Sequence, residues 1–338
     1  MAFLMDAWYV AAFSEEITDK PFARTILGVP LVFWRLPDGQ LAVLEDRCCH
    51  RAYPLSRGHI AEGQIQCGYH GMVYDQSGAC TKIPWQKVIP KVAQVRAYQA
   101  LDRYGWVWVW MGAAEAANPE DIPDYHWLDS SDWGAKADYL HVQCDYRLII
   151  ENLLDLTHLA FVHASTIGNS AVAEQADVKF DRSETDVTVT RWTLDAPPPP
   201  TYAKVGNFPG HVDRWQIINF EPPGYIRLDV GACPAGTGAP QGHFQDGIRM
   251  RNMNVLTPES ETSTHYFWGQ AHDFDVTNSQ LTDMIFGQVK TAFLEDVSVF
   301  EAQQQRINLE PERGFVNFSG DVGGVAALRL LDQRIATA

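Results

Sequence analysis

The pattern of apolar and polar positions divides the chain into a strand-rich first third and a mixed remainder. Residues 22–112 form short apolar runs separated by turn residues, which predicts strands. Pro37-Asp38-Gly39 separates two of these runs and predicts a hairpin. Residues 105–112 alternate Trp with Val, as expected for a strand with two different faces. The polar, proline-containing stretch 118–123 is the predicted boundary between two domains.

Beyond this boundary, helical and strand patterns follow one another in blocks. Residues 146–163 predict the first helix, and residues 178–234 and 248–270 return to strand patterning. Residues 281–307 contain no proline and predict a long helix. Strands, helix, strands and long helix in this order favour an α+β chain over a parallel βαβ sheet. The predicted domains are residues 1–118 and 119–338.

The charge balance narrows the classes of partner. The chain has 26 Lys and Arg against 42 Asp and Glu, a formal net charge of -16. We expect such an acidic protein to bind neither nucleic acid nor an anionic membrane. The N-terminal apolar run lacks a basic flank and is interrupted by Asp6, so it does not resemble a signal peptide or an anchor. A cytoplasmic location is therefore expected.

Cysteine and histidine cluster in a pattern typical of a metal site. The six cysteines are unevenly spaced in a chain that is not short, so a disulfide framework is not expected. Cys48 and His50 form one Cys-x-His arm, and Cys67 and His70 form a Cys-x-x-His arm. A Rieske [2Fe–2S] centre needs two thiolates on one iron and two imidazoles on the other. Each arm supplies one ligand of each kind, so the four residues predict a Rieske cluster.

A structural zinc site is the alternative, because two cysteines and two histidines also bind zinc. Zinc fingers usually place both cysteines on one arm and both histidines on the other, whereas here each arm mixes them. The glycines around the arms, Gly58, Gly68 and Gly71, are expected to take the positive φ angles of tight loops. Four further cysteines are predicted to be packed thiols: Cys49, Cys80, Cys144 and Cys233.

A second group of polar residues lies on the predicted helix 146–163. Asn152, Asp155 and His158 recur every three residues, which would make Asp155 and His158 neighbours on one helical face. His163 follows five residues later, so the helix must bulge or end before both histidines can reach one metal. Two histidines and one carboxylate leave positions open on a non-haem iron. The third ligand must come from elsewhere, and a zinc hydrolase is disfavoured because no His-Glu-x-x-His motif is present.

Several segments of the chain resemble the Rieske non-haem iron oxygenases, and the likeness runs nearly end to end. The similarity is closest to the oxygenase components of vanillate O-demethylase, toluenesulfonate methyl-monooxygenase and dicamba O-demethylase. It implies an N-terminal β-sandwich carrying the cluster and a C-terminal helix-grip domain, in which a curved antiparallel sheet wraps a long helix. The segments that carry the resemblance are residues 8–12, 47–51, 54–56 and 69–71.

The resemblance also assigns roles to single residues. It supplies Asp296 as the third ligand of the mononuclear Fe(II), although Glu295 is adjacent and sequence alone does not choose between them. It makes Asp155 a bridge, whose carboxylate accepts from the ring of His158 and contacts His70 of a neighbouring subunit. Asn152 is expected to support the iron site. Electrons would then cross between subunits of a homotrimer.

The activity implied by the resemblance is a monooxygenase reaction on an aromatic acid. A separate reductase carrying flavin and an iron–sulfur centre would deliver electrons from NAD(P)H, and O2 would be the co-substrate. Hydroxylation of a methoxy group gives a hemiacetal that loses formaldehyde, whereas hydroxylation of an aryl methyl group gives an alcohol. The alternative function is that of a Rieske electron-transfer protein without oxygenase activity. The candidate substrate contacts are Leu228, Met253, Asn254, His265, Phe286 and Gly287.

Overall fold

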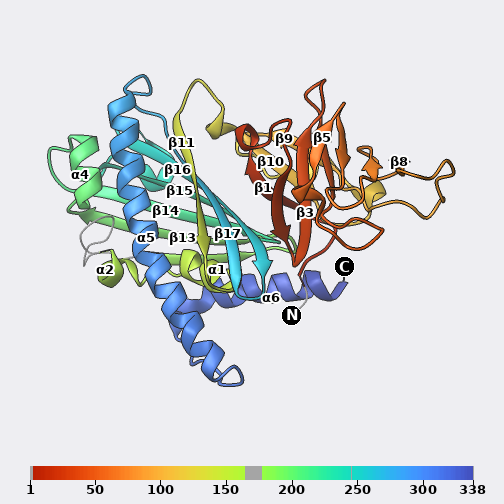
Figure 1. Cartoon of the computed structure of the whole chain (residues 1–338). Coiled ribbons are helices and arrows are strands. Elements are labelled where there is room, and N and C mark those ends of the chain that lie inside the picture. Colours follow the sequence, from red (N-terminus) through yellow and green to blue (C-terminus); the bar gives the residue numbers. More distant parts are fainter. Residues whose placement is uncertain (1–2, 164–176, 245, 338) are drawn as a thin grey trace. The chain divides into compact units, whose positions relative to one another are not determined.

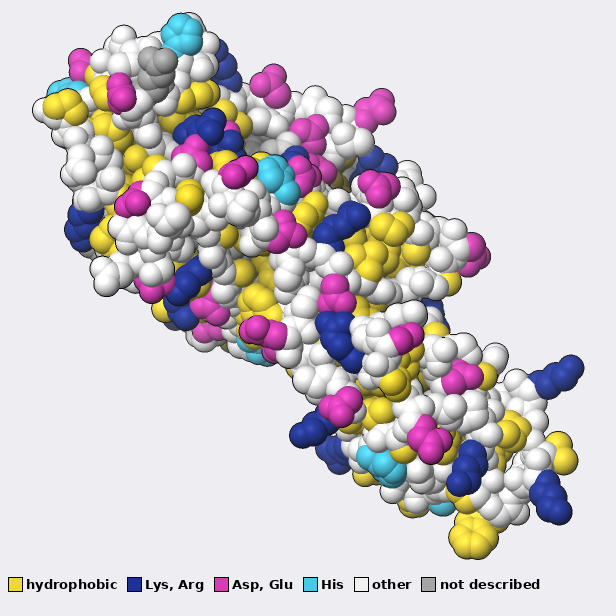
Figure 2. All heavy atoms as spheres, turned by 90° about the horizontal axis from the view of Figure 1, so that it is seen from above, with side chains coloured by type: hydrophobic (Ala, Val, Ile, Leu, Met, Phe, Trp, Pro, Cys, Tyr) yellow, Lys and Arg dark blue, Asp and Glu magenta, His cyan; other side chains and the backbone are white. Residues whose placement is uncertain are grey.

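The computed structural model describes residues 3–163, 177–244 and 246–337, and the chain divides into two compact units (Figure 1). The N-terminal unit comprises Met5–Pro123 together with Thr257–Ser260. The C-terminal unit comprises Asp124–Leu256 and Glu261–Ala338, with the first residues of the chain. Asp and Glu side chains are dispersed over the face in Figure 2, with Lys and Arg among them. None of the described helices combines the length and apolarity needed to cross a membrane.

The N-terminal unit is built from three small sheets. Their strand orders are β1-β10-β9, β2-β3-β4 and β5-β6-β7-β8, and the neighbouring strands are antiparallel. The strands are β1 (Trp8–Phe13), β2 (Phe22–Ile26), β3 (Val29–Arg35), β4 (Leu41–Glu45), β5 (His59–Ala61), β6 (Gln64–Gln66), β7 (Val73–Tyr74), β8 (Cys80–Lys82), β9 (Ala100–Arg103) and β10 (Trp106–Trp110). Short 3-10 turns lie at Ser14–Glu16, Leu55–Arg57, Ala114–Ala116 and Pro119–Asp121.

The predicted features of this unit are present with two differences. The hairpin at Pro37-Asp38-Gly39 joins β3 to β4, and Gly39 has a φ of 86°. The first predicted run is two strands, because Leu27 and Gly28 take positive φ angles and turn the chain between β2 and β3. All five residues of β10 are buried, since β10 is the central strand of its sheet. The Trp–Val alternation therefore marks a strand buried on both faces.

The C-terminal unit contains a seven-stranded sheet in the order β11-β17-β16-β15-β14-β13-β12. Its strands are β11 (Gly134–Val142), β12 (Asp177–Arg182), β13 (Val187–Ala196), β14 (Val212–Glu221), β15 (Tyr225–Pro234), β16 (Ile248–Ser260) and β17 (Ser263–His272). Its helices are α1 (Tyr146–Leu154), α2 (Leu159–Val162), α4 (Pro200–Gly206), α5 (Ser279–Leu309) and α6 (Val322–Thr337), with 3-10 turns at His126–Leu128, Ala239–Gln241 and Ser319–Asp321. Figure 1 shows α5 lying across one face of the sheet.

This arrangement confirms the predicted α+β class and the long helix, which extends by two residues at each end of the predicted span. The predicted helix 146–163 is wrong as one element, because α1 ends at Leu154 and α2 begins only at Leu159. The helix α6 was not predicted. It contains Gly323 and Gly324, whose lack of side chains lets it approach α1: a Cβ on Gly324 would lie 3.1 Å from the Cα of Glu151.

Candidate metal centres and active-site cavity

The four predicted cluster ligands lie on two loops of the N-terminal unit that share one backbone geometry. In each loop the cysteine N–H donates to the carbonyl oxygen five residues later, at 2.9 Å for Cys48 and 2.8 Å for Cys67. The N–H four residues after the cysteine donates back to the cysteine carbonyl. That residue has a positive φ in both loops, 57° at Ala52 and 73° at Gly71. The two arms are therefore matched turns, as a site with one thiolate and one imidazole from each arm requires.

The two thiols of this site are buried, whereas the two imidazoles are exposed. Cys48 and Cys67 are each only 2% exposed, whereas His50 and His70 are exposed and their ring centroids lie 4.5 Å apart. Burial raises the pKa of the Cys67 thiol, while backbone N–H groups of Tyr69 and His70 favour its thiolate. The residues fit a [2Fe–2S] cluster whose cysteine-bound iron is inside and whose histidine-bound iron is at the surface.

The hydroxyl of Tyr74 lies beside this site, 3.1 Å from the Sγ of Cys48 and 3.2 Å from that of Cys49. Cys49 is exposed, so the prediction that it is a packed thiol is wrong. Its Sγ contacts the same Tyr74 hydroxyl as the predicted cluster ligand Cys48. The prediction of packed thiols is confirmed for the other three, since Cys80, Cys144 and Cys233 are buried.

The glycines near the cluster loops are needed for two different reasons. Gly71 has the expected positive φ, but Gly58 and Gly68 do not, and the φ of Gly58 is -94°. At Gly58 the reason is space, because a Cβ would lie 2.0 Å from the carbonyl oxygen of Gln66. Gly68 is also tight, with a Cβ placed 2.8 Å from the carbonyl oxygen of Arg57. The close approach of the backbone at Gly58 and Gly68 was not foreseen from sequence.

Gly58→Ala is therefore expected to destabilise the N-terminal unit by about 1–3 kcal/mol, because the Gln66 backbone must move to admit the methyl group. Thermal unfolding and visible absorbance per chain would measure the effect on stability and on cluster content. Gly210→Ala is the matched control, since no atom lies within 4 Å of a Cβ at that position. Equal melting temperatures of the two variants would contradict the prediction.

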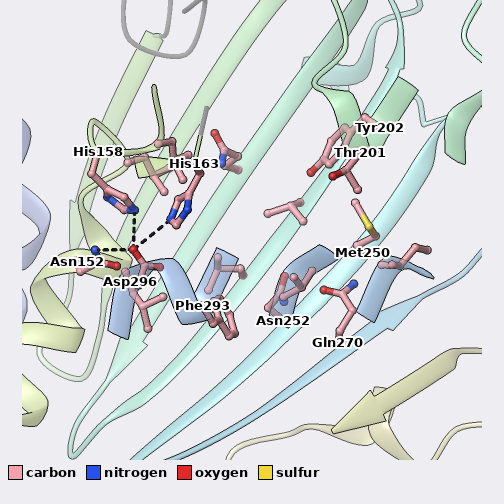
Figure 3. Close-up of a pocket in the computed structure, with 18 of the residues that line it drawn as sticks. Asn152, His158, His163, Thr201, Tyr202, Met250, Asn252, Gln270, Phe293 and Asp296 are labelled. Carbon is pink, nitrogen blue, oxygen red and sulfur yellow. Dashed lines mark hydrogen bonds and ion pairs between the residues drawn. The ribbon is translucent and has the colours of Figure 1, made fainter. Parts of the chain in front are cut away.

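The second site begins where α1 ends. Asp155 is the C-cap residue of α1, His158 precedes α2 and His163 follows it. Asp155 and His158 therefore do not share a helical face, and that prediction is wrong. The four residues of α2 form a single turn between the histidines, which turns both rings toward the same side (Figure 3). The predicted helix is thus interrupted at Asp155, before His158, and a second short helix separates the two histidines.

Asp296 of α5 completes a compact group with these histidines. Its Oδ1 lies 3.1 Å from His163 Nε2 and 3.7 Å from His158 Nε2, as Figure 3 shows. One ligand atom from each of the three residues lies within 4.8 Å of the others. His163 is 1% exposed and Asp296 is 5% exposed. Two imidazoles and one carboxylate facing a common point fit the ligand set of a mononuclear Fe(II).

Hydrogen bonds to the remaining ring nitrogens orient both histidines. His158 Nδ1 donates to the carbonyl oxygen of Asp155 at 2.5 Å, and His163 Nδ1 donates to Glu295 Oε2 at 2.7 Å. With Nδ1 protonated, each Nε2 keeps a lone pair for a metal. The prediction that the carboxylate of Asp155 orients His158 is wrong, because this carboxylate accepts from the N–H and Oγ1 of Thr157 at 2.8 and 3.0 Å.

Asn152 and the local electrostatics support the same reading. Its Nδ2 donates to Asp296 Oδ1 at 3.3 Å, and its Oδ1 is buried without a hydrogen-bond partner among the described residues. Burial lowers the pKa of His158, which favours the neutral ligand form. Burial also disfavours the cation of His163, but Asp296 and Glu295 outweigh it and raise its pKa. An open polar atom beside three convergent ligand atoms fits a bound ion.

The adjacent carboxylates of Glu295 and Asp296 face different histidine nitrogen atoms, so substitutions of the two residues should affect iron binding differently. Asp296→Ala should remove the mononuclear iron, because its oxygen faces both Nε2 atoms. Glu295→Gln should retain the iron with affinity lowered by about 10–100-fold, since it orients a ligand without facing the metal position. Titration of each apoprotein with Fe(II) would measure this. Equal iron affinity in the two variants would contradict the assignment.

A cavity opens beside the three ligands in the C-terminal unit. It encloses about 710 Å³ of space not filled by atoms, including the open solvent at its mouth. Most of its wall is apolar, with polar side chains at a few positions. Its lining includes Leu153, Leu156, Leu159, Leu228, Val230, Met250, Ile285, Val289 and Phe293, with Thr201, Tyr202, Arg214, Gln216, Asn252 and Gln270.

Of the six candidate substrate contacts, Leu228 lines this cavity and the others do not. Met253 and Asn254 lie on β16 beside Asn252, which does line the cavity. Asn254 is fully buried and is bonded to Ile226 O and to the hydroxyl of Tyr266. The remaining three have other neighbours or open space: His265 contacts Tyr139, Phe286 stacks on Trp268, and Gly287 has nothing within 4 Å of a Cβ.

Sequence reasoning missed the buried polar residues on the inner faces of β13 and β14. Arg191, Arg214 and Gln216 are each no more than 5% exposed. Arg191 Nη1 donates to the carbonyl oxygen of Leu156 at 2.9 Å and so holds the turn that precedes His158. The sequence pattern that could have found these residues is a charged or amide side chain at every second position of a strand, on the face that is expected to be apolar.

Comparisons with known proteins cover both units of the chain. The model of the Rieske [2Fe-2S] domain matches residues 7–96, and that of the vanillate O-demethylase oxygenase C-terminal domain matches residues 142–337. The chain is 40% identical to the toluene-4-sulfonate monooxygenase system iron-sulfur subunit of Comamonas testosteroni, covering 98% of this chain and 96% of the relative. It is 39% identical to the vanillate O-demethylase oxygenase subunit of Pseudomonas sp. strain HR199, covering 99% and 95%. Dicamba monooxygenase bound to dicamba superimposes with a TM-score of 0.89 at 30% identity, covering 100% and 99%.

Proposed function

The chain belongs to the Rieske non-haem iron oxygenases, and we propose that it oxidises a methyl or methoxy carbon of an aromatic acid. The observation that carries the proposal is the convergence of His158, His163 and Asp296 at the wall of a largely apolar cavity. A Rieske electron-transfer protein, the alternative function, needs neither these ligands nor the cavity.

The residues that would hold the [2Fe–2S] cluster and those that would hold the Fe(II) lie in different parts of the chain. Residues 1–118 would hold the [2Fe–2S] cluster through Cys48, His50, Cys67 and His70. Residues 119–338 would hold Fe(II) through the three ligands beside the cavity. When bound, the cluster would supply single electrons and the iron would activate O2, of which one atom enters a C–H bond and the other is reduced to water.

The chain's own residues position and protect this chemistry. The Asp155 carbonyl and the Glu295 carboxylate keep both histidine Nε2 atoms available. Asn152 holds one oxygen of Asp296. Leucine side chains of α1 and α2 and the side chain of Phe293 form an apolar wall next to the ligands, which excludes water from a bound aromatic ring.

The electrons should come from a separate reductase that carries flavin and its own iron–sulfur centre. The names of the relatives, an oxygenase subunit and an iron-sulfur subunit of a monooxygenase system, support a protein of several components. Gly236 and Gly238 lie between β15 and a three-residue 3-10 turn and do not open a helix as a nucleotide-binding loop does. Reduction of the purified protein by NADH alone would contradict this part of the proposal.

The test combines metal content with substrate-dependent turnover. Anaerobically purified protein should contain iron for one [2Fe–2S] cluster and one mononuclear site, which is three irons per chain. With a suitable reductase, vanillate or toluene-4-sulfonate should stimulate NADH and O2 consumption and yield an oxidised product. Two irons per chain and no aromatic acid that stimulates O2 consumption would favour the electron-transfer protein instead.

A further inference from the structure

The inner face of the sheet carries a buried arginine that the iron chemistry does not require. Arg214 is 4% exposed and lines the cavity from β14. Its guanidinium stacks at 4.8 Å over the ring of Tyr202. Among the described residues that line the cavity, Asp296 at the metal site is the only one with a carboxylate side chain. The cavity therefore has a carboxylate at its metal end and a fixed cation elsewhere in its wall.

The position of this cation is given by its contact with Tyr202. Figure 3 shows Tyr202 and Thr201 on the side of the cavity opposite His158, His163 and Asp296. The space between is bounded by apolar side chains of neighbouring strands. Val230 pairs with Gln216 on one side and with Met250 on the other, and all three line the cavity. An aromatic ring placed there would have the metal ligands at one end and the guanidinium at the other.

Two buried amides add polar atoms to the cavity wall. Gln216 follows Arg214 by two residues on β14, so both side chains point to the same face of the sheet. Gln270 on β17 is 2% exposed. The Oε1 atoms of Gln216 and Gln270 are buried without a hydrogen-bond partner among the described residues. Buried acceptors of this kind are normally satisfied by a ligand or water, so the cavity is equipped for a polar group.

We propose that Arg214 is the specificity-determining residue that binds the anionic group of the substrate at the end of the cavity remote from the iron ligands. The inference rests on the proposed function and refines it, because it explains why an acid would be preferred to a neutral aromatic compound. A guanidinium pairs with a carboxylate or sulfonate through charge-assisted hydrogen bonds, which are stronger inside a dry cavity than in water. The acid group held by Arg214 directs the opposite end of the ring toward the metal site.

The test compares the binding of an acid with that of its neutral ester, so that turnover is not needed. Dissociation constants of vanillate and methyl vanillate would be measured by calorimetry on the anaerobic, iron-loaded protein. Wild-type protein should prefer the acid. Arg214→Gln should weaken acid binding by about 10–100-fold, as expected for the loss of a charged hydrogen-bond partner, and change ester binding by less than about 3-fold. Arg214→Lys should restore part of the preference for the acid. Its ammonium group keeps the positive charge but lacks the paired N–H donors of a guanidinium.

Arg249→Gln is the matched control, since Arg249 lies on β16, pairs with Asp273 and does not line the cavity. It should keep the wild-type ratio of acid to ester affinity. Equal losses for acid and ester in Arg214→Gln would show a merely structural role and overturn the inference. A wild-type protein that binds the ester as tightly as the acid would also overturn it, even if O2-dependent turnover confirmed the proposed function. Failure of the proposed function would instead appear as two irons per chain.

Discussion

His158→Ala and His163→Ala are each expected to abolish turnover while the visible spectrum of the Rieske cluster remains unchanged. The reason is that the two sites use separate ligands in separate units of the chain. Each alanine removes one of three convergent ligand atoms and leaves Asp296 buried with a single imidazole. The loss should exceed the roughly 100-fold that is typical when only a residue behind a metal ligand is changed.

Product formation, iron content and absorbance per chain would be measured on the same preparations. Both variants should lose one iron of three and keep the cluster absorbance. His211→Ala is the matched control, because that imidazole is more than half exposed and lies on the loop before β14. Loss of cluster absorbance in a folded His158 or His163 variant would contradict the separation of the two sites. Retention of turnover would contradict the assignment of the ligands.

The cluster could be predicted from sequence because its ligands lie close together along the chain. Cys48 with His50 and Cys67 with His70 each form one turn, so local spacing already describes much of the geometry. The reason for Gly58 could not be predicted, since the atom that excludes a side chain there belongs to the Gln66 backbone on another strand. Such a contact depends on how β5 and β6 pair, which the spacing of residues along the chain does not describe.

The iron site shows the same limit more strongly. The resemblance supplied Asp296 as the third ligand. Only the three-dimensional structure shows that Asp296 faces the Nε2 atoms of both histidines, whereas Glu295 accepts from Nδ1 of His163. The break after Leu154 was missed because Asp155, Leu156 and Thr157 do not include a proline or glycine that would end a helix. The break is stabilised by tertiary contacts, such as the hydrogen bond from Arg191 to Leu156 O.

The substrate contacts were the least predictable part of the site. Met253 and Asn254 were chosen on the correct strand, but Asn252 is the residue of this stretch that lines the cavity. A strand alternates its side chains between two faces, so Met253 points to the face opposite Asn252. Asn254 shares the face of Asn252, but its amide is bonded to Ile226 O and to the hydroxyl of Tyr266. Asn252 pairs with Leu228, the one candidate that does line the cavity, and this pairing would have corrected the choice.

Asp155→Asn is expected to remove most of the turnover without loss of iron. The backbone carbonyl of Asp155 orients His158, and the substitution leaves that carbonyl in place. The asparagine oxygen can still accept from the N–H of Thr157, so the turn should persist. What changes is the charge of the side chain. We propose that this charge acts on His70 of a neighbouring subunit in a homotrimer, where it assists electron transfer to the iron site.

The measurement is the rate of cluster oxidation in a single turnover, with substrate and O2 present and the cluster reduced beforehand. Asp155→Asn should contain three irons per chain and remain a trimer by light scattering, yet oxidise its cluster far more slowly than wild type. Thr157→Val is the matched control, because it removes a hydroxyl donor to the same carboxylate and leaves the charge. A near-normal rate in Asp155→Asn would mean that the carboxylate only stabilises the turn before His158. A wild-type protein that is monomeric in solution would remove the basis for transfer between subunits, since the electron would then have to pass within one chain.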